Sequence, residues 1–227
     1  NEANYIDKII FKIKKLDWKV LNFNYEIIVV DDGSTDNTQN VLNNIDSIKI
    51  INQENKGKGN AVQNGIANST GDYILIQDAD LEYDPSDYYN LLAPLQTEKK
   101  ISVYGSRPMN IKREDIFLSD KHQMQSYGSY FMNKLLCVMF KNLFRLNLTD
   151  PLTGYKVYER NFFLNHRITS EGFEADHEIT IKLIKSGYKI LEVPIRYNPR
   201  SKSEGKKINL LDAFKAMYIL VKLKLKF

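Results

Sequence analysis

Two pairs of aspartates stand where short apolar segments end. Asp31 and Asp32 follow residues 26–30, and Asp78 and Asp80 follow residues 73–76. Side chains alternate along a strand, so the two carboxylates of an Asp-x-Asp can face the same cleft. Paired carboxylate oxygens suit Mg²⁺ or Mn²⁺, which keeps several waters and bridges substrate phosphates. The second pair therefore predicts a metal site that neutralises a diphosphate leaving group, although Asp-x-Asp alone is also common in surface turns.

A second group of polar residues accompanies the first pair. Asp31 and Asp32 lead into Gly-Ser-Thr-Asp, which is typical of a turn and a helix cap. The same position also suits carboxylates that bind a nucleotide base and ribose. Gly57 and Lys58 belong to a Gly-Lys-Gly segment that can approach phosphates. This segment is a weak signal by itself, because the spacing of a Walker motif is missing.

Alternating strands and helices would bring these residues to one edge of a sheet, where ligands bind in open α/β folds. The first half predicts strands at residues 26–30, 48–51, 73–76 and 101–104, and helices at residues 6–16, 41–45, 61–66 and 86–97. The second half predicts an apolar, aromatic segment at 124–144, a helix at 174–186, a strand at 188–193 and a basic amphipathic helix at 209–227. This order predicts an α/β fold with a doubly wound, mostly parallel sheet and helices on both faces.

Composition limits the class of protein. The 227 residues are 43% hydrophobic and 26% charged, which fits one large globular domain and excludes a disordered chain. A net charge of +4 without a nucleic-acid-binding motif does not favour a nucleic-acid partner. The single Cys137 excludes an internal disulfide and fits a reducing compartment. No segment reaches the ~18–20 apolar residues of a membrane span, and we expect no signal peptide.

The motifs taken together resemble glycosyltransferase family 2. The matching segments, in the family's order, are residues 28–36, 55–59, 71–81, 104–107, 150–156, 172–174 and 200–208. They most resemble a subgroup of dolichyl-phosphate mannose synthase-like and polyprenyl-phosphate glucosyltransferase-like enzymes. The resemblance implies a single GT-A domain over residues 1–227, with a nucleotide-binding half at 1–105, an acceptor half at 106–208 and the basic helix at 209–227. It also implies Mg²⁺- or Mn²⁺-dependent, inverting transfer of a hexose from a nucleotide-sugar of the UDP-glucose or GDP-mannose type.

The resemblance further implies roles for individual residues. Asp32, with Asp31, would contact the base, while Asp78, Asp80 and Glu82 would hold the metal. The implied donor-binding residues are Glu2, Asp31, Asp32, Gly57, Lys58, Asp78, Arg200 and Lys206, and the implied catalytic residues are Asp80, Arg107 and Asp176. The cations Arg107, Arg200 and Lys206 would face phosphate groups of donor or acceptor. Glu2 remains from a family Pro-x-Tyr-Asn-Glu motif, so we expect the first strand of the family to be absent from this chain.

The acceptor stays open at the level of sequence. A glycan hydroxyl, as in cell-surface polysaccharide assembly, needs a general base, for which Asp176 is the candidate. A polyprenyl or dolichyl phosphate is already an anion, and Asp176 would then only shape the site or favour a helix N-terminus. The basic aromatic segments 124–144 and 209–227 favour the lipid, because such helices can lie on the cytoplasmic face of a membrane. They can also pack on the sheet or in a dimer. Intact Asp32, Asp78 and Asp80 argue against an inactive nucleotide-binding scaffold.

Overall fold

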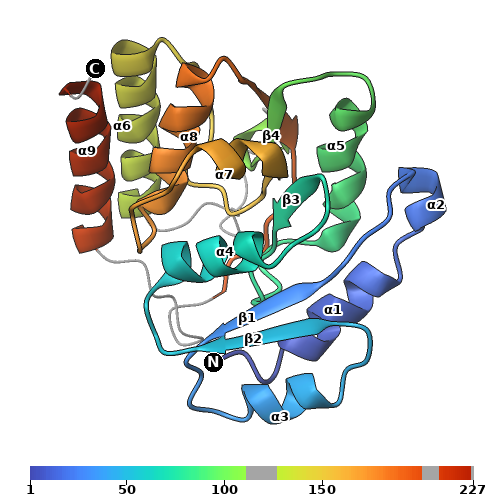
Figure 1. The fold of residues 1–227 in the computed structure, drawn as a ribbon. Coiled ribbons are helices and arrows are strands. Elements are labelled where there is room, and N and C mark those ends of the chain that lie inside the picture. Colours follow the sequence, from blue (N-terminus) through green and yellow to red (C-terminus); the bar gives the residue numbers. More distant parts are fainter. Residues whose placement is uncertain (111–126, 201–209, 226–227) are drawn as a thin grey trace.

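The computed structural model describes residues 1–110, 127–200 and 210–225, and its strands form two sheets (Figure 1). In the first sheet, β1 (Ile28–Asp32) pairs in parallel with β2 (Lys49–Gln53). In the second sheet the strand order is β3 (Tyr73–Ile76), β5 (Lys156–Glu159), β4 (Ile101–Ser106) and β6 (Lys189–Pro194). The α/β architecture predicted from the sequence is confirmed.

Most helices lie where apolar periodicity predicted them. They are α1 (Ile6–Lys14), α3 (Thr38–Asn43), α4 (Lys58–Ala67), α6 (Tyr127–Phe144), α8 (Ala175–Lys185) and α9 (Leu210–Leu225). The i, i+3, i+4 spacing of α1 places four isoleucines on one buried face. The predicted helix 86–97 is instead α5 (Tyr88–Leu92) between two 3₁₀ turns. Pro94 in the second turn has no backbone N–H and disfavours a continuous helix.

The strand directions differ from the predicted mostly parallel sheet. β1–β2 and β4–β6 are parallel pairs, but β5 lies between β3 and β4 and runs antiparallel to both. The sequence analysis predicted neither β5 nor the short helices α2 (Trp18–Leu21) and α7 (Arg160–Asn165) that accompany the main elements. β5 has only four residues, Lys-Val-Tyr-Glu, and the pattern of apolar and charged residues over so short a length does not identify a buried strand.

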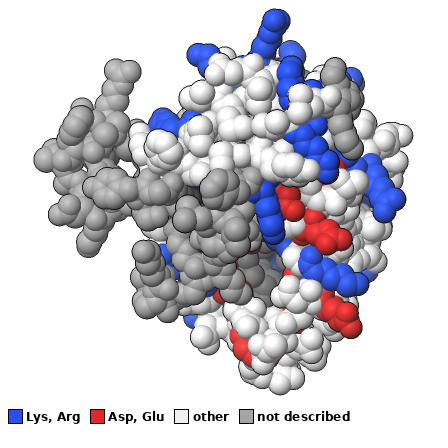
Figure 2. Space-filling model, turned by 90° about the vertical axis from the view of Figure 1, so that its left-hand side faces the viewer, with Lys and Arg blue, Asp and Glu red and all other residues white. Residues whose placement is uncertain are grey.

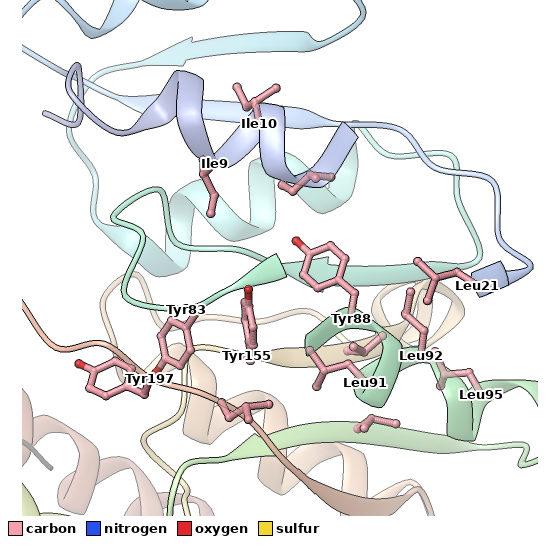
Figure 3. Close-up of a cluster of buried hydrophobic side chains, with 14 of the residues drawn as sticks. Ile9, Ile10, Leu21, Tyr83, Tyr88, Leu91, Leu92, Leu95, Tyr155 and Tyr197 are labelled. Carbon is pink, nitrogen blue, oxygen red and sulfur yellow. The ribbon is translucent and has the colours of Figure 1, made fainter. Parts of the chain in front are cut away.

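One hydrophobic core joins the two sheets. The isoleucines of α1 pack with residues of α5 and with a group of buried tyrosines that includes Tyr83, Tyr88, Tyr155 and Tyr197 (Figure 3). Among the described residues, β1 has only β2 as a neighbour and β3 has only β5, so each strand keeps one unpaired edge. That the first strand of the family is absent stays a prediction.

A second core lies between the helices of the C-terminal half. Leu136 and Phe140 of α6 pack with Ile181 of α8 and with Ile219 and Leu220 of α9, and these three helices stand side by side (Figure 1). One face of α6 and one face of α9 are therefore buried within the protein, mainly against each other and α8. Their outer faces, on the side away from the sheets, remain exposed.

Candidate active site

The two aspartates that follow β3 each have a cationic partner. Lys58 Nζ lies 2.8 Å from Asp78 Oδ1, and Arg200 Nη2 lies 3.2 Å from Asp80 Oδ2. Leu81 adopts a left-handed backbone conformation, with φ of 60°, in the turn after Asp80. Burial and the neighbouring charge of Asp78 raise the pKa of Asp80 to about 6. The structure therefore brings both carboxylates close together, and their role in holding a cation stays a prediction.

The donor atoms at this place suit a hard divalent ion held by few protein ligands. The described residues contain no group of three or more His, Cys, Asp or Glu side chains that could hold a metal. Asp78 and Asp80 supply two carboxylates, which suits Mg²⁺ or Mn²⁺ completed by water and phosphate oxygens. Gly154 keeps space beside them, because a Cβ at this position would lie only 2.6 Å from Asp78 Oδ2. The two aspartates thus fit such an ion.

Glu82, the expected third metal ligand, has protein partners on both carboxylate oxygens. The Tyr197 hydroxyl donates to Oε2 at 2.7 Å, and the Arg200 backbone N–H donates to Oε1 at 2.8 Å. The Arg200 side chain turns back and donates to both oxygens of Glu2, at 3.0 and 3.1 Å. Glu2, Asp80 and Glu82 are therefore linked through Arg200. Lys206, the other predicted phosphate-facing cation, lies outside the described residues.

A cavity of about 260 Å³ lies beside the carboxyl end of β1, next to the N-terminal residues. The two aspartates there have different environments. Asp32 accepts the backbone N–H groups of Lys56 and Gly57, at 2.8 and 2.9 Å, and a further bond from Gln53 at 2.7 Å. Asp31 lines the cavity and is buried, and its Oδ2 has no hydrogen-bond partner. Asp31 therefore retains an acceptor for a ligand, whereas Asp32 fixes the loop that carries Gly57.

Lys58 connects the aspartate pair to the second half of the chain. Burial lowers the pKa of this lysine, but the charges of Asp78 and Asp176 outweigh burial and raise it. Its helix, α4, approaches α8 closely because residue 59 is glycine, where a Cβ would meet Ala175 Cβ at 2.7 Å. Lys58 is thus held as a charged group between two carboxylates.

Asp176, the candidate base, is paired with a buried cation that the sequence analysis missed. Lys156 Nζ lies 3.2 Å from Asp176 Oδ2, and the lysine side chain is only 1% exposed. Burial alone would raise the pKa of Asp176, but the charges of Lys156 and Lys58 outweigh it and lower that pKa. The only signal in the sequence was a lysine between Tyr155 and Val157, two residues that are now seen to be buried.

Arg107 is buried and bound to an acidic residue for which the sequence analysis proposed no role. Its Nε and Nη2 donate to the two oxygens of Asp150, both at 2.6 Å, and its backbone N–H donates to the same carboxylate. The guanidinium also lies over the Tyr197 ring, 4.9 Å from its centre. Direct contact of Arg107 with a substrate phosphate stays a prediction, and such contact would have to compete with this bidentate pair.

Comparison with known proteins identifies the class of this site. Residues 1–166 match the sequence model of the family described as glycosyl transferase family 2. The chain is 29% identical over 185 residues to "Glycosyltransferase AglJ" of Haloferax volcanii, covering 81% of this chain and 57% of that protein. It is 28% identical over 237 residues to "UDP-N-acetylglucosamine--dolichyl-phosphate N-acetylglucosaminyltransferase" of Methanococcus voltae, covering 94% of this chain and 91% of that protein. The chain thus spans little more than half the length of the first of these relatives.

The fold is also similar to solved structures. Glucosyl-3-phosphoglycerate synthase of Mycobacterium tuberculosis, in complex with Mn²⁺, UDP-glucose and phosphoglyceric acid, superposes with a TM-score of 0.69 at 18% identity, covering 99% of this chain and 76% of that chain. At this identity the likeness concerns the fold, and it confirms the GT-A fold expected from the sequence. No helix among the described residues has the length and apolar character needed to cross a membrane.

Proposed function

Because the chain belongs to glycosyl transferase family 2, we propose that it transfers a hexose from a nucleotide-sugar to a polyprenyl or dolichyl phosphate with inversion, using Mg²⁺ or Mn²⁺. The name of the Methanococcus voltae relative supports a dolichyl-phosphate acceptor. The structurally similar synthase with bound Mn²⁺ and UDP-glucose supports the metal and the donor class. In this chain, the observation that supports a lipid-phosphate acceptor is the ion pair between Asp176 and the buried Lys156.

The donor would bind along the carboxyl ends of β1 and β3. The base would enter the cavity, where the unpartnered Oδ2 of Asp31 can accept one of its N–H groups. Asp78 and Asp80 would hold the metal, which would supply positive charge to the departing diphosphate. Lys58 and Arg200 now contact these two carboxylates. Both cations would become available to phosphate oxygens when the carboxylates bind the metal, so no charge is left unpaired.

The acceptor would bring its own negative charge. Deprotonation of a sugar hydroxyl needs a base with a pKa near the working pH, but the pKa of Asp176 is lowered by Lys156 and Lys58. A lipid phosphate is already ionised. One of its oxygens would attack the anomeric carbon from the face opposite the diphosphate, the new C–O bond would form as the old one breaks, and the nucleoside diphosphate would leave with the bonding electrons. This displacement needs no proton transfer.

The outer faces of α6 and α9 support contact with an anionic lipid surface, and we place this contact at the cytoplasmic face of a membrane. They alternate exposed apolar and cationic side chains, namely Phe131, Lys134, Val138 and Lys141 in α6, and Lys215, Tyr218, Val221, Lys222, Lys224 and Leu225 in α9. Residues 130–144 and 215–225 contain no Asp or Glu. Figure 2 shows this side of the molecule, where basic groups are scattered over a mostly uncharged upper region. Such a surface can lie in the headgroup plane, with lysine stems reaching along it.

A donor and acceptor screen tests the proposal. UDP- and GDP-sugars with Mn²⁺ would be offered to the protein with a short polyprenyl phosphate or with a neutral glycan, and the product's anomeric configuration would be read by NMR. We expect transfer to the lipid phosphate with inversion and loss of transfer in excess chelator. Transfer to the glycan without transfer to the lipid phosphate would contradict the proposed lipid acceptor and favour a glycan acceptor. Flotation with anionic and neutral vesicles tests the membrane contact, and equal recovery with both would exclude charge-assisted binding.

A further inference from the structure

Glu82 was expected to bind a metal together with Asp78 and Asp80. Its carboxylate instead binds residues 197 and 200. Its two carboxylate oxygens accept the Tyr197 hydroxyl and the Arg200 backbone N–H, at 2.7 and 2.8 Å. Its own backbone carbonyl accepts the Asn198 N–H at 2.8 Å, and Tyr83 forms an isolated β-bridge with Tyr197. Residues 82–83 and 197–200 are therefore joined by three hydrogen bonds, of which the backbone bond from Asn198 to Glu82 belongs to the β-bridge.

The joined segments determine where Arg200 lies. Its guanidinium contacts Asp80 and, with two hydrogen bonds, Glu2. The backbone N–H of Arg200 donates to Glu82 Oε1, so Glu82 holds the backbone from which the guanidinium extends. The Tyr197 ring is itself fixed, because it packs on Tyr83 with 5.0 Å between ring centres and lies beneath the guanidinium of Arg107. Glu82 thus fixes the Arg200 backbone, and Glu2 and Asp80 bind its guanidinium.

We propose that Glu82 is a positioning residue that holds Arg200 at the diphosphate end of the donor site, rather than a third ligand of the metal. The proposal rests on the proposed function, since it concerns the same donor site. Arg200 would contribute a fixed positive charge toward the phosphates, and a preoriented cation binds an anion without an added ordering cost. Asp78 and Asp80 would be the only two protein ligands among the described residues, and water and phosphate oxygens would complete the coordination of the ion.

Four variants separate the two roles. Glu82→Ala removes both carboxylate contacts, and Tyr197→Phe removes one of them while leaving the carboxylate and the ring in place. Glu82→Gln keeps both contacts, because its amide oxygen can accept the Arg200 N–H and its amide N–H can donate to the Tyr197 hydroxyl oxygen. Glu98→Ala, at an exposed glutamate, is the control for the loss of a carboxylate.

Two measurements are made on each variant of the full chain. Mn²⁺ binding is measured by electron paramagnetic resonance without nucleotide, and Asp80→Ala defines the loss expected of a true ligand. UDP and GDP binding with Mn²⁺ is measured by calorimetry. We expect Glu82→Ala and Tyr197→Phe to bind Mn²⁺ within about twofold of the wild type, but to bind the nucleoside diphosphate about tenfold more weakly. Glu82→Gln should bind both as the wild type does.

The outcomes distinguish the two proposals. A loss of Mn²⁺ binding in Glu82→Ala comparable to that in Asp80→Ala, with Tyr197→Phe unaffected, would make Glu82 a ligand and overturn the positioning role. Unchanged diphosphate affinity in both Glu82→Ala and Tyr197→Phe would overturn it as well. If the wild type binds neither Mn²⁺ nor a nucleoside diphosphate, the proposed function fails, and the positioning role fails with it. A circular dichroism melt of each variant shows whether a loss of binding comes from unfolding.

Discussion

Lys156→Met removes the buried cation that faces Asp176 and tests whether the pair is structural or catalytic. Methionine has a similar length and no charge, so the change leaves the space filled. The lysine side chain is 1% exposed and the aspartate side chain 19% exposed. Among the described residues, Lys156 Nζ makes polar contacts with Asp176 Oδ2 at 3.2 Å and with the Pro151 carbonyl at 3.4 Å. The charge of either residue therefore depends strongly on the other.

The expected loss of stability follows from this burial. Removing one partner of a buried ion pair costs about 3–5 kcal/mol, because the remaining charge is left unpaired. We expect Lys156→Met and Asp176→Asn each to lower the free energy of unfolding by an amount near the lower end of that range, since the aspartate is partly exposed. The double variant K156M/D176N leaves no unpaired charge, so it should lose much less than the sum of the two.

Urea denaturation followed by Trp18 fluorescence and circular dichroism would measure the four free energies of the double-mutant cycle. The pair of Lys12 and Asp84 is a matched control, because it is separated by 3.0 Å compared with 3.2 Å but has side chains 48% and 29% exposed. Its coupling should not exceed about 1 kcal/mol. Additive losses for Lys156 and Asp176 would refute the claim that the two charges depend on each other.

Activity in the same variants tests the chemical argument. If the acceptor is a lipid phosphate, K156M/D176N should retain transfer to it within about tenfold, because no proton has to be removed. A general base would instead contribute about 10²–10⁴-fold. A loss of that size in the folded double variant, with nucleotide affinity unchanged, would make Asp176 the base and favour a hydroxyl acceptor.

Gly154→Ala should lower Mn²⁺ affinity at least about tenfold, because its Cβ would lie 2.6 Å from Asp78 Oδ2; a Mn²⁺ titration with wild-type affinity would contradict this. Asp32→Asn should weaken UDP and GDP binding in calorimetry and lower the free energy of unfolding by about 1–3 kcal/mol, because its carboxylate accepts two backbone N–H groups. The pKa of Glu178 is lowered to about 2, since its hydrogen bonds, the one from Lys182 foremost, outweigh burial. Its contribution to stability is therefore present above its ordinary pKa of 4.5 and is lost as the pH falls toward 2. Glu178→Gln should remove that part of the acid dependence in urea melts, and an unchanged profile would argue against it.

The sequence predicted the elements whose signal is local. The spacing of Ile6, Ile9, Ile10 and Ile13 predicted α1 because one helix face meets the core. The position of Asp78 and Asp80 followed from a rule about strand ends. β5 was missed because its evidence is not local. It is a strand because Ile74 and Leu75 pair with Tyr158 and Val157, more than 80 residues away, and no periodicity within four residues records that pairing.

Local sequence patterns also could not predict which charged side chains pair with one another. Lys156 stands in a short stretch of mixed apolar and charged residues, and in the fold it is buried against Asp176, a carboxylate from another segment. The same holds for Arg107, which the resemblance placed toward a phosphate and which the structure places against Asp150. Residue types predicted which charges exist, but the fold determines which of them are available to a substrate.

The charges at the donor end show what this availability means for binding. Asp78 and Asp80 are paired with Lys58 and Arg200, so the carboxylates that would hold a metal and the cations that would hold a diphosphate neutralise one another in this structure. A metal alone would take Asp78 and Asp80 from these cations and leave Lys58 near Asp176 and Arg200 with Glu2, and a diphosphate alone would free the two aspartates. The two together supply a partner for both aspartates and for both cations. The pairing therefore favours binding of the metal and the nucleotide as one unit, and this selectivity comes from the spatial arrangement of four side chains that the sequence shows only as separate charges.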